Sequence, residues 1–420
     1  MKSKAKRRHP PAIPAALAAE SRRAIELHQQ GHLMEAESLY RRILTAMPMH
    51  FDSLHLLGVI KAQQNEFAAA LPFFEQAVRV NPASASAFNN FGNVLHALGR
   101  YDQALASYDR SLALRADNAK ALMHRGNTLR KLQRPDEALA SYDRALRLRP
   151  DYAEALIHRG GALTEMGRYD EAVAAYRQAL ASGGDAPRII YSLACLGAEA
   201  VPKASPMEYV KGLFDQYADA FDEHLVEALE YKTPTFLVDA LRALMPPDTG
   251  SLDVVDLGCG TGLCGPLLRP LARTLVGVDL SPKMLAKAGE RGGYDELVCA
   301  EVAAYLAGQP QRFDVGVAAD VFVYIGDLSE VFTGMRKVLR PGGWFGFSVE
   351  AGDGTDFILR PSHRFAHSLD YLRRLAASEG FMIRSLESRV LRKNRGTDVP
   401  GHLVIMQREH QIDPEYLDLV

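Results

Sequence analysis

The stretch SLDVVDLGCGTGLCGPLLRPL, residues 251–271, decides the fold of the second half of the chain. It begins with a short apolar run, Leu252 to Leu257, which predicts a buried strand of a parallel sheet. Gly258, Gly260 and Gly262 follow in a G-x-G-x-G arrangement. Because glycine has no side chain, the backbone of such a loop can approach a ligand closely, and the next predicted helix points its first N–H groups at that ligand.

A glycine loop alone does not distinguish among nucleotide-binding folds, so its surroundings matter. Asp256 directly precedes the loop, and Asp279 ends a second predicted strand, where a carboxylate can accept hydrogen bonds from ribose hydroxyls. The loop lacks the wider G-x-G-x-x-G spacing of dinucleotide sites. A later strand ends in RFDVGVAADVFVYIGD, and a helix and VLRPGGWFGFSVE follow. The segments FMIRSLESRVLRKN and HLVIMQRE predict two final strands, joined by a turn containing Gly396 and Pro400.

The order of these motifs resembles that of class I S-adenosylmethionine-dependent methyltransferases, and the resemblance extends from Pro206 to about residue 409. It implies a Rossmann-like, doubly wound α/β domain with a mostly parallel seven-stranded sheet that one antiparallel strand closes. It also implies S-adenosylmethionine as the cofactor. Because the methyl group of that cofactor is already activated, alignment and exclusion of water can carry most of the rate, and a base is needed only where the acceptor atom starts protonated.

The resemblance assigns cofactor contacts by motif. It implies that Asp256 and the glycine loop hold the methionine part and that Asp279 holds the ribose. Tyr217, in the segment YADAFD, corresponds to a tyrosine that lies over the cofactor. Glu301 departs from the aspartate that the family usually has there. The positions implied are Asp256, Gly258, Gly260, Gly262, Asp279, Leu280, Glu301, Val302, Asp320 and Tyr217.

The sequence identifies no catalytic residue, but Asp320, Tyr324, Glu350 and His367 are candidates for facing the methyl acceptor. Asp320 and Glu350 end predicted strands, at the edge where open α/β sheets bind ligands. His367 belongs to the segment HRFAHS, which also offers a second histidine and Arg364. The ordinary pKa of histidine would suit a base, although capping and packing are the favoured interpretation of this segment.

The first half of the chain repeats with a period of 34 residues. Small residues at the repeating glycine and alanine positions let two helices approach closely, and an aromatic side chain fills the space beside them. Gly31, Gly99 and Gly167 stand where the first helix of each pair must end, and glycine suits a left-handed turn. The pattern resembles the tetratricopeptide repeat, with about five units. The positions in phase are Gly58, Gly92, Gly126 and Gly160; Ala36, Ala70, Ala104, Ala138 and Ala172; Tyr40, Phe74, Tyr108, Tyr142 and Tyr176; and, at the turn, Asn65 and Gln133.

By the same resemblance, such an array binds a protein or peptide in the groove that the first helix of each unit lines. Candidate partner-binding residues on that face are Asn89, Asn93, Asn127, Arg130 and Lys131. Side-chain amides can hydrogen-bond an extended backbone at both its N–H and its C=O. Solvated polar positions, or contacts to the second domain, are equally open interpretations.

These patterns predict an all-α solenoid followed by an α/β domain. We expect a basic disordered tail over residues 1–18 and the repeat array over 19–186. A capping half-repeat and a linker rich in small residues and proline should occupy 187–205, and the methyltransferase domain 206–420.

The composition excludes several classes of protein. A chain of 420 residues with 47% hydrophobic and 24% charged residues is ordinary for a soluble globular protein, and the net charge of -2 gives no overall attraction to nucleic acid or anionic membrane. None of the 4 cysteines forms a C-x-x-C pair, which argues against a metal site or a disulfide framework. No apolar run is long enough to span a bilayer, and no secretory signal is evident, so we expect a cytoplasmic protein.

We therefore expect an S-adenosylmethionine-dependent methyltransferase whose acceptor is unidentified. One alternative is an adaptor that binds the cofactor in a catalytically silent domain, and another is a nicotinamide-dependent oxidoreductase. The intact Asp256, glycine loop and Asp279 argue against the first, and the downstream motifs argue against the second. Nucleobase acceptors are disfavoured, because the sequence lacks an Asn/Asp-Pro-Pro-Tyr segment after the fourth strand and a Pro-Cys dipeptide.

Overall fold

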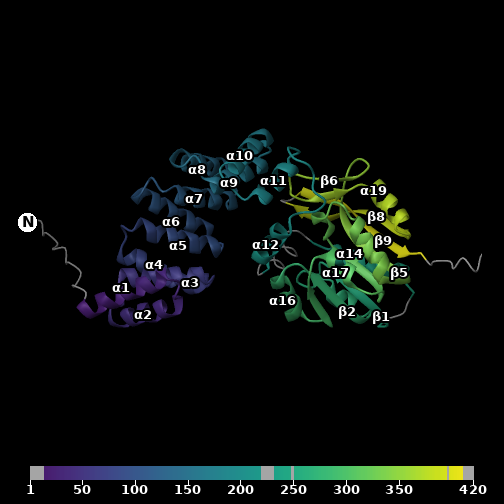
Figure 1. Cartoon of the computed structure of the whole chain (residues 1–420), viewed down its shortest axis with the longest axis horizontal. Helices are drawn as coiled ribbons and strands as arrows, with labels where there is room; N and C mark the ends of the chain where they lie inside the picture. The colour runs from purple at the N-terminus through teal and green to yellow at the C-terminus, as the bar shows by residue number, and fades with distance from the viewer. Residues whose placement is uncertain (1–13, 219–230, 247–249, 395–396, 410–420) are drawn as a thin grey trace, which may run out of the picture. The chain divides into compact units, whose positions relative to one another are not determined.

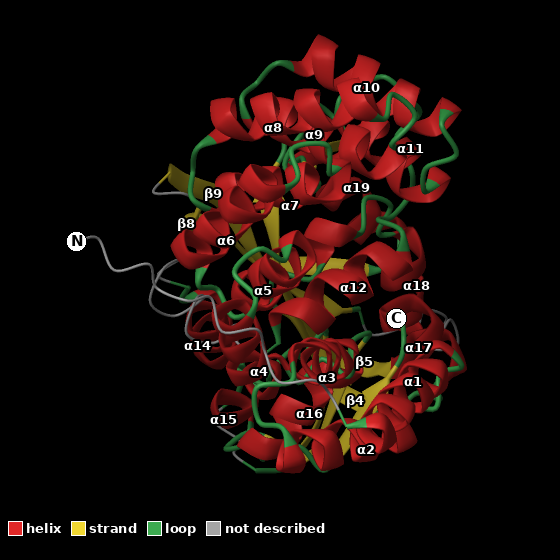
Figure 2. Ribbon diagram, turned by 90° about the vertical axis from the view of Figure 1, so that its left-hand side faces the viewer, coloured by secondary structure: helices red, strands yellow, loops and turns green. Residues whose placement is uncertain are grey.

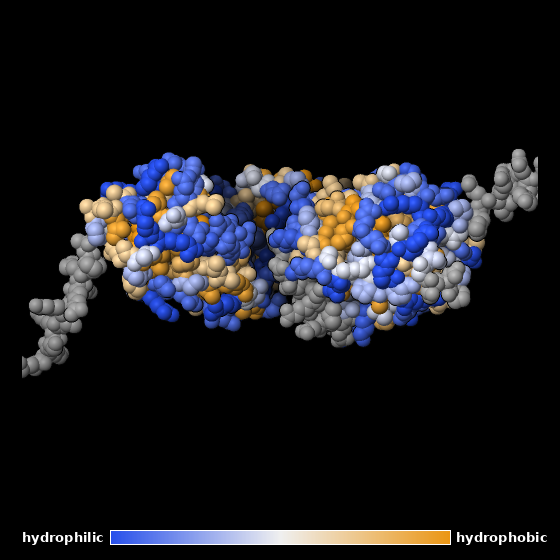
Figure 3. Space-filling view, turned by 90° about the horizontal axis from the view of Figure 1, so that it is seen from below, coloured by the Kyte–Doolittle hydropathy of each residue, from blue (hydrophilic) through white to orange (hydrophobic). Residues whose placement is uncertain are grey.

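The computed structural model describes residues 14–218, 231–246, 250–394 and 397–409. Contacts within the chain divide it into two units, Met1–Gly184 and Asp185–Val420 (Figure 1). Each unit mixes hydrophilic and hydrophobic residues on the face seen in Figure 3. Within the described residues, no helix combines the length and the apolar character that crossing a membrane would require.

The first unit is a stack of helical hairpins. Consecutive helices pair as α1 with α2, α3 with α4, and so on to α9 with α10, and each hairpin packs on the next. The helices in its described residues are α1 (Ala15–Gln29), α2 (Leu33–Ala46), α3 (Phe51–Gln63), α4 (Phe67–Val80), α5 (Ala85–Ala97), α6 (Tyr101–Leu114), α7 (Ala119–Lys131), α8 (Pro135–Leu148), α9 (Ala153–Glu165) and α10 (Tyr169–Ala181).

The repeating glycines and aromatics meet within each hairpin, as their spacing predicts. A Cβ atom placed on Gly92 of α5 would lie only 2.7 Å from Cε1 of Tyr108 on α6. The turn positions are also confirmed, since Gly99 has a φ of 72° and Gln133, in phase with it, has a φ of 58°. Close packing therefore requires glycine at the position of Gly92, and backbone geometry favours glycine at the turn position of Gly99.

Two expected boundaries differ in the structure. Helix α1 begins at Ala15, so residues 15–18 belong to the first helix rather than to a tail, because alanine and leucine favour helix after Pro14. The helix expected to cap the array, α11 (Ala186–Cys195), belongs to the second unit. There the hydroxyl of Tyr191 lies 2.6 Å from Ser205 Oγ and donates to His363 O at 2.9 Å.

The second unit is a doubly wound α/β fold (Figure 2). Its further helices are α12 (Met207–Tyr217), α14 (Thr233–Leu244), α15 (Gly265–Leu268), α16 (Pro282–Arg291), α17 (Val302–Gly308), the 3-10 helix η2 (Phe322–Tyr324), α18 (Ser329–Val338) and α19 (Leu369–Ser378). Its strands are β1 (Leu252–Leu257), β2 (Ala272–Asp279), β3 (Glu296–Cys299), β4 (Phe313–Ala318), β5 (Leu339–Ala351), β6 (Phe357–Leu359), β7 (Phe365–His367), β8 (Phe381–Asn394) and β9 (Thr397–Arg408).

Within the part of the chain that the structure describes, the sheet holds nine strands rather than the seven expected. Its main path is β3-β2-β1-β4-β5-β7-β6, and β9 pairs antiparallel with both β5 and β8. The extra strands β6 and β7 form a short hairpin, and residues 360–364 are its turn. The rings of Phe357 on β6 and Phe365 on β7 lie 6.0 Å apart. The two final strands are confirmed, but Pro400 lies within β9, opposite Val390, and Gly396 lies outside the described residues.

Two apolar layers cover the sheet. On one face, α17, α18 and α19 contribute residues such as Leu306, Phe332 and Leu372 to the core. On the other face, α14 and α15 contribute Leu237 and Leu268. The central strands are therefore buried on both sides, which leaves the carboxyl ends of β1, β2 and β4 as the place where a ligand can enter.

Candidate functional site

A cavity of about 450 Å³ lies at the carboxyl ends of the parallel strands of the second unit. Its wall includes Gly258 and Gly260 after β1, Asp279 after β2, and Asp320 after β4. The volume is within the range of cofactor and small-molecule sites.

The glycine loop has the backbone geometry that only glycine adopts easily. Gly258, Gly260 and Gly262 all have positive φ angles, of 66°, 55° and 84°. A side chain on Gly258 would collide with Val321. Gly262 is not part of the cavity wall, because it packs against Tyr294, whose Cε2 atom would lie 3.1 Å from a Cβ placed there. The first two glycines therefore shape the cavity, and the third permits packing.

The Asp279 carboxylate is held in the wall by the backbone. Its two oxygens accept hydrogen bonds from Gly260 N at 2.9 Å and from Ser281 N at 2.8 Å. Burial raises the pKa of this carboxyl above its usual value. Ser281, not Asp279, caps α16, since its hydroxyl accepts from Met284 N. Each carboxylate oxygen of Asp279 retains acceptor capacity for a ligand.

The structure does not bring Asp256 into the cavity wall. Its side chain leaves β1 towards Tyr294, whose hydroxyl donates to Asp256 Oδ2 at 2.6 Å, and Oδ1 is buried without a hydrogen-bond partner. Burial raises the pKa of this carboxyl to about 7, although the Tyr294 hydrogen bond opposes the shift. Asp256 therefore lies behind the cavity wall, next to Tyr294.

The opposite part of the wall contains Leu280, Glu301 and Val302, as expected from the motifs. Glu301 also has a structural role, because Oε2 accepts a hydrogen bond from Ala304 N at 2.7 Å and so caps α17. The longer glutamate side chain is thus used to begin a helix.

The segment expected to be a linker forms part of the cavity wall. Ser205 N donates to Tyr324 O at 2.9 Å, and Gly326 N donates to Lys203 O at 2.8 Å. The Lys203 ammonium also pairs with Asp327 at 3.1 Å. Residues 203–205, which we call the strap, are therefore fixed to the chain after β4 rather than free.

Helix α12 adds an apolar surface beside the strap. Its Phe214 ring lies 5.4 Å from the ring of Tyr324, edge to face, and both residues line the cavity. The Asp215 carboxylate accepts a hydrogen bond from Ser281 Oγ at 2.6 Å, which joins α12 to the start of α16. Tyr217 ends this helix, but its side chain lies outside the described residues.

An ion-pair network occupies the end of the cavity near β4 and β5, which we call the acceptor end. Arg392 donates to Asp320 Oδ2 at 2.7 Å and also to Glu350. Ser348 Oγ donates to Asp320 Oδ1 at 3.0 Å. Asp320 adopts a φ of 58°, which is unusual for a residue other than glycine. Among the candidates for facing the acceptor, Asp320 and Tyr324 line the cavity, whereas Glu350 lies behind Arg392 and is 4% exposed.

His367 is not available as a base. It is fully buried, does not line the cavity, and its Nε2 lies 2.9 Å from Gly326 O. Burial lowers its pKa to about 4. Its ring stacks on Tyr371 at 5.8 Å, so the packing role favoured from the sequence is the one observed.

Arg392, Tyr231 and the strap are wall residues that sequence reasoning missed. Arg392 stands in a strand, and a register shift between Val390 and Arg392 breaks the alternation of β8, so that Leu391 and Arg392 are both buried. An arginine within an apolar strand pattern is the signal that could have indicated it.

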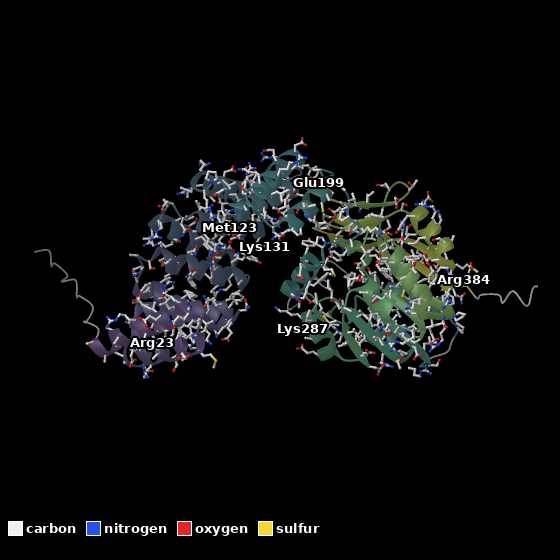
Figure 4. All side chains as sticks on the ribbon, viewed as in Figure 1. Arg23, Met123, Lys131, Glu199, Lys287 and Arg384 are labelled. Atoms are coloured by element: carbon white, nitrogen blue, oxygen red, sulfur yellow. The ribbon has the colours of Figure 1, made fainter. Side chains whose placement is uncertain are left out.

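The proposed partner-binding residues of the first unit are only partly free. The amide oxygens of Asn93 and Asn127 accept hydrogen bonds from Tyr108 and Tyr142 at 2.8 and 2.7 Å. Asn89 is 8% exposed. Arg130 forms a two-pronged ion pair with Glu165 on α9, and Lys131, at the end of α7, is exposed (Figure 4).

Comparisons with known proteins match the two units separately. The model of a methyltransferase domain matches residues 255–347, tetratricopeptide repeat models match residues 92–133 and 123–187, and a model of anaphase-promoting complex, cyclosome, subunit 3 matches residues 29–111.

Curated relatives match part of the chain. Ubiquinone biosynthesis O-methyltransferase of Thiobacillus denitrificans is 30% identical over an alignment of 187 residues, and the match covers 37% of this chain and 78% of that protein. The enzyme of the same name from Paraburkholderia phymatum is 28% identical, over 30% of this chain and 59% of its own length. Methyltransferase-like protein 27 of Homo sapiens is 34% identical, over 31% of this chain and 53% of its own length.

Among solved structures, one of the MamA protein covers 40% of this chain and 91% of its own, with 22% identity and a TM-score of 0.38.

Proposed function

We propose that the chain transfers the methyl group of S-adenosylmethionine to an acceptor, and that cofactor and acceptor bind in the cavity at the carboxyl ends of the parallel strands. The chain belongs to the methyltransferase family and carries tetratricopeptide repeats in front of its methyltransferase domain. The observation that carries this proposal is the cavity wall, where Gly258, Gly260 and Asp279 meet Leu280 and Asp320. The matching curated relatives are named as methyltransferases.

The wall suits the chemistry of this cofactor. The Asp279 carboxylate, fixed by two backbone hydrogen bonds, offers acceptor positions for a ribose diol. Leu280 and Val302 offer apolar surface for an adenine ring, and the glycine backbone admits a close approach to the methionine part. The bound cofactor would supply an electrophilic methyl group that needs no further activation.

The residues of the chain would align the acceptor and exclude water. The strap and the Phe214 ring both contact Tyr324, and all three line the cavity together with Asp320. Burial raises the pKa of the Tyr324 phenol, which therefore stays protonated and can donate a hydrogen bond to an acceptor. Alignment and desolvation of this kind lower the barrier of a methyl transfer.

Calorimetric titration of the full chain with S-adenosylmethionine and, separately, with NAD tests the proposal. We expect saturable binding of S-adenosylmethionine at about micromolar affinity and no binding of NAD. Asp279→Asn, which keeps the shape of the side chain, should weaken binding by at least about tenfold, because it removes the charge that ribose hydroxyls approach.

Glu290→Ala, on the exposed side of α16, is the matched control and should bind as the wild type does. Circular dichroism of both variants separates lost binding from lost folding. A wild-type chain that fails to bind S-adenosylmethionine, or that binds NAD in its place, would refute the proposal.

We further propose that the first unit recruits a protein or peptide. The exposed Lys131 and the amide groups of Asn93 and Asn127, whose oxygens are already fixed by tyrosine hydroxyls, present ordered polar groups to such a partner. Because these amides are held in place before binding, a partner meets them at little additional entropic cost.

A further inference from the structure

Three arginines and two carboxylates meet at the acceptor end. Arg392 bridges Asp320 and Glu350. Arg360 pairs with Glu350 Oε2 at 3.3 Å, and Arg364 lies 3.5 Å from Glu350 Oε1. Glu350 and Arg392 are each 4% exposed, whereas the side chains of Arg360 and Arg364 are each 30% exposed, so these two form the open side of the cluster.

Counted over the described residues, the cluster contains one more positive than negative charge. The other carboxylates of the cavity wall have roles elsewhere: Asp279 accepts backbone hydrogen bonds, Glu301 caps α17, Asp327 pairs with Lys203, and Glu330 is exposed at the start of α18. The excess positive charge therefore lies on the partly exposed arginines of the cluster, where a ligand anion can pair with it.

Arg364 is the arginine that remains available. Both terminal nitrogens of Arg392 are used by carboxylates, and Arg360 donates to Ala351 O at 2.6 Å as well as pairing with Glu350. Arg364 lines the cavity, and its single ion pair among the described residues is the longest of the three on Glu350. A guanidinium has five N–H donors in a fork that matches a carboxylate.

We propose that the methyl acceptor carries one carboxylate group, held by Arg364, on an otherwise apolar body. The inference rests on the proposed methyl transfer and names the class of its acceptor. One excess positive charge matches one carboxylate, whereas a phosphate would bring a charge of about -1.5 to -2. The apolar body follows from the neighbouring wall, where Val210, Phe214 and Val323 contribute hydrocarbon surface.

The cofactor has a carboxylate of its own, which Arg364 could instead bind. The implied methionine position is the glycine loop after β1, whereas Arg364 belongs to the turn between β6 and β7 and contacts Glu350 at the end of β5. The two possibilities differ in one measurable quantity, the affinity of an Arg364 variant for the cofactor.

The test uses the full chain saturated with S-adenosylhomocysteine. Calorimetric titrations would compare benzoate, 3-phenylpropionate and octanoate, each against its neutral primary amide. We expect at least one acid to bind saturably and at least about tenfold more tightly than its amide. Arg364→Gln should abolish this preference and keep the wild-type affinity for S-adenosylmethionine within about twofold.

Arg373→Gln is the matched control. Arg373 has the same ion-pair distance of 3.5 Å, to Asp370, but it lies exposed on α19 outside the cavity wall, so its variant should keep the preference. The proposal is overturned if no acid binds better than its amide, if Arg364→Gln retains the preference, or if Arg364→Gln loses S-adenosylmethionine binding in parallel. A wild-type chain that binds no S-adenosylmethionine would instead overturn the proposed function itself.

Discussion

The helical first unit and the cavity of the second unit are stabilised by contacts of opposite kinds. In the first unit the same contact recurs, since Gly58, Gly92, Gly126 and Gly160 each admit an aromatic ring from the next helix of the hairpin. In the second unit the contact between Asp320 and Arg392 occurs once and joins residues 72 positions apart. A local, repeated contact can be recognised from its period, whereas a single long-range contact leaves no such pattern.

The same contrast predicts how each unit responds to change. In the first unit, the contribution of apolar contacts to stability is divided among neighbouring hairpins. The cavity instead depends on a few charges that are shielded from water. Four experiments compare these responses, in order of decreasing expected effect.

The largest effect is expected from Arg392→Ala. Removal of this guanidinium leaves Asp320 and Glu350 without their closest cation, so the free energy of unfolding of the second unit should fall by about 3–5 kcal/mol. Urea denaturation measures it. Arg389→Ala, on the exposed part of the same strand, should change stability by less than about 1 kcal/mol. Equal losses of unfolding free energy in the two variants would show that the buried network contributes no more to stability than an exposed ion pair does.

A smaller effect with a defined pH dependence is expected at Asp256. Its pKa is raised from 3.8 to about 7 in the folded state, so the folded chain binds more protons than the unfolded chain between these values. This contribution to stability is complete below about pH 4 and is lost as the pH rises through about 7. The unfolding free energy of the wild type, relative to that of Asp256→Asn, should therefore decrease by about 2–4 kcal/mol as the pH rises from about 4 to about 7.

His124 in the first unit should give a pH dependence of stability with the opposite sign. Burial lowers its pKa from 6.5 to about 4, so the folded chain binds fewer protons than the unfolded chain between these values, and stability falls as the pH is lowered through this range. His124→Gln should remove that loss on acidification. If both variants changed the pH dependence in the same direction, the charge states assigned to the two units would be wrong.

The smallest effect is expected in α9, where two adjacent glycines differ in their surroundings. A Cβ atom on Gly160 would lie 2.7 Å from Tyr176 Cε1, while one on Gly161 would lie 3.4 Å from the flexible Arg130 head group. Gly160→Ala should destabilise the first unit by about 1–2 kcal/mol, and Gly161→Ala should be neutral or stabilising by up to about 1 kcal/mol. Thermal unfolding of both variants checks this, and a larger loss in Gly161→Ala would contradict the packing argument.

Much of the fold could be predicted, because its signals are local. The period of 34 residues predicted the hairpins, and the glycine loop with Asp279 predicted the two strands, β1 and β2, that end at the cavity. The hairpin of β6 and β7 was missed because its strands have only three residues each, too few for a pattern.

The site itself was predicted less completely than the fold. Gly258, Asp279 and Asp320 lie in the wall as their motif positions imply. Asp256 does not, because the direction of a side chain depends on which face of β1 meets Tyr294. The strap was missed because its hydrogen bonds go to residues 324–327, far along the chain.

Because β8 contains a register shift, the site depends on the number of residues in the paired strands as well as on their identity. Leu391 is the additional residue that lets Arg392 face inward after Val390 faces solvent. A single codon inserted into β9 between Val399 and Pro400 would give Leu391 a partner, restore simple alternation and turn Arg392 outward. Substitutions at Arg392 change one charge, but an in-frame insertion opposite Leu391 would remove the charge from the cavity while preserving every other residue. Related genes can therefore gain or lose this charge in one step, without passing through a mutated arginine.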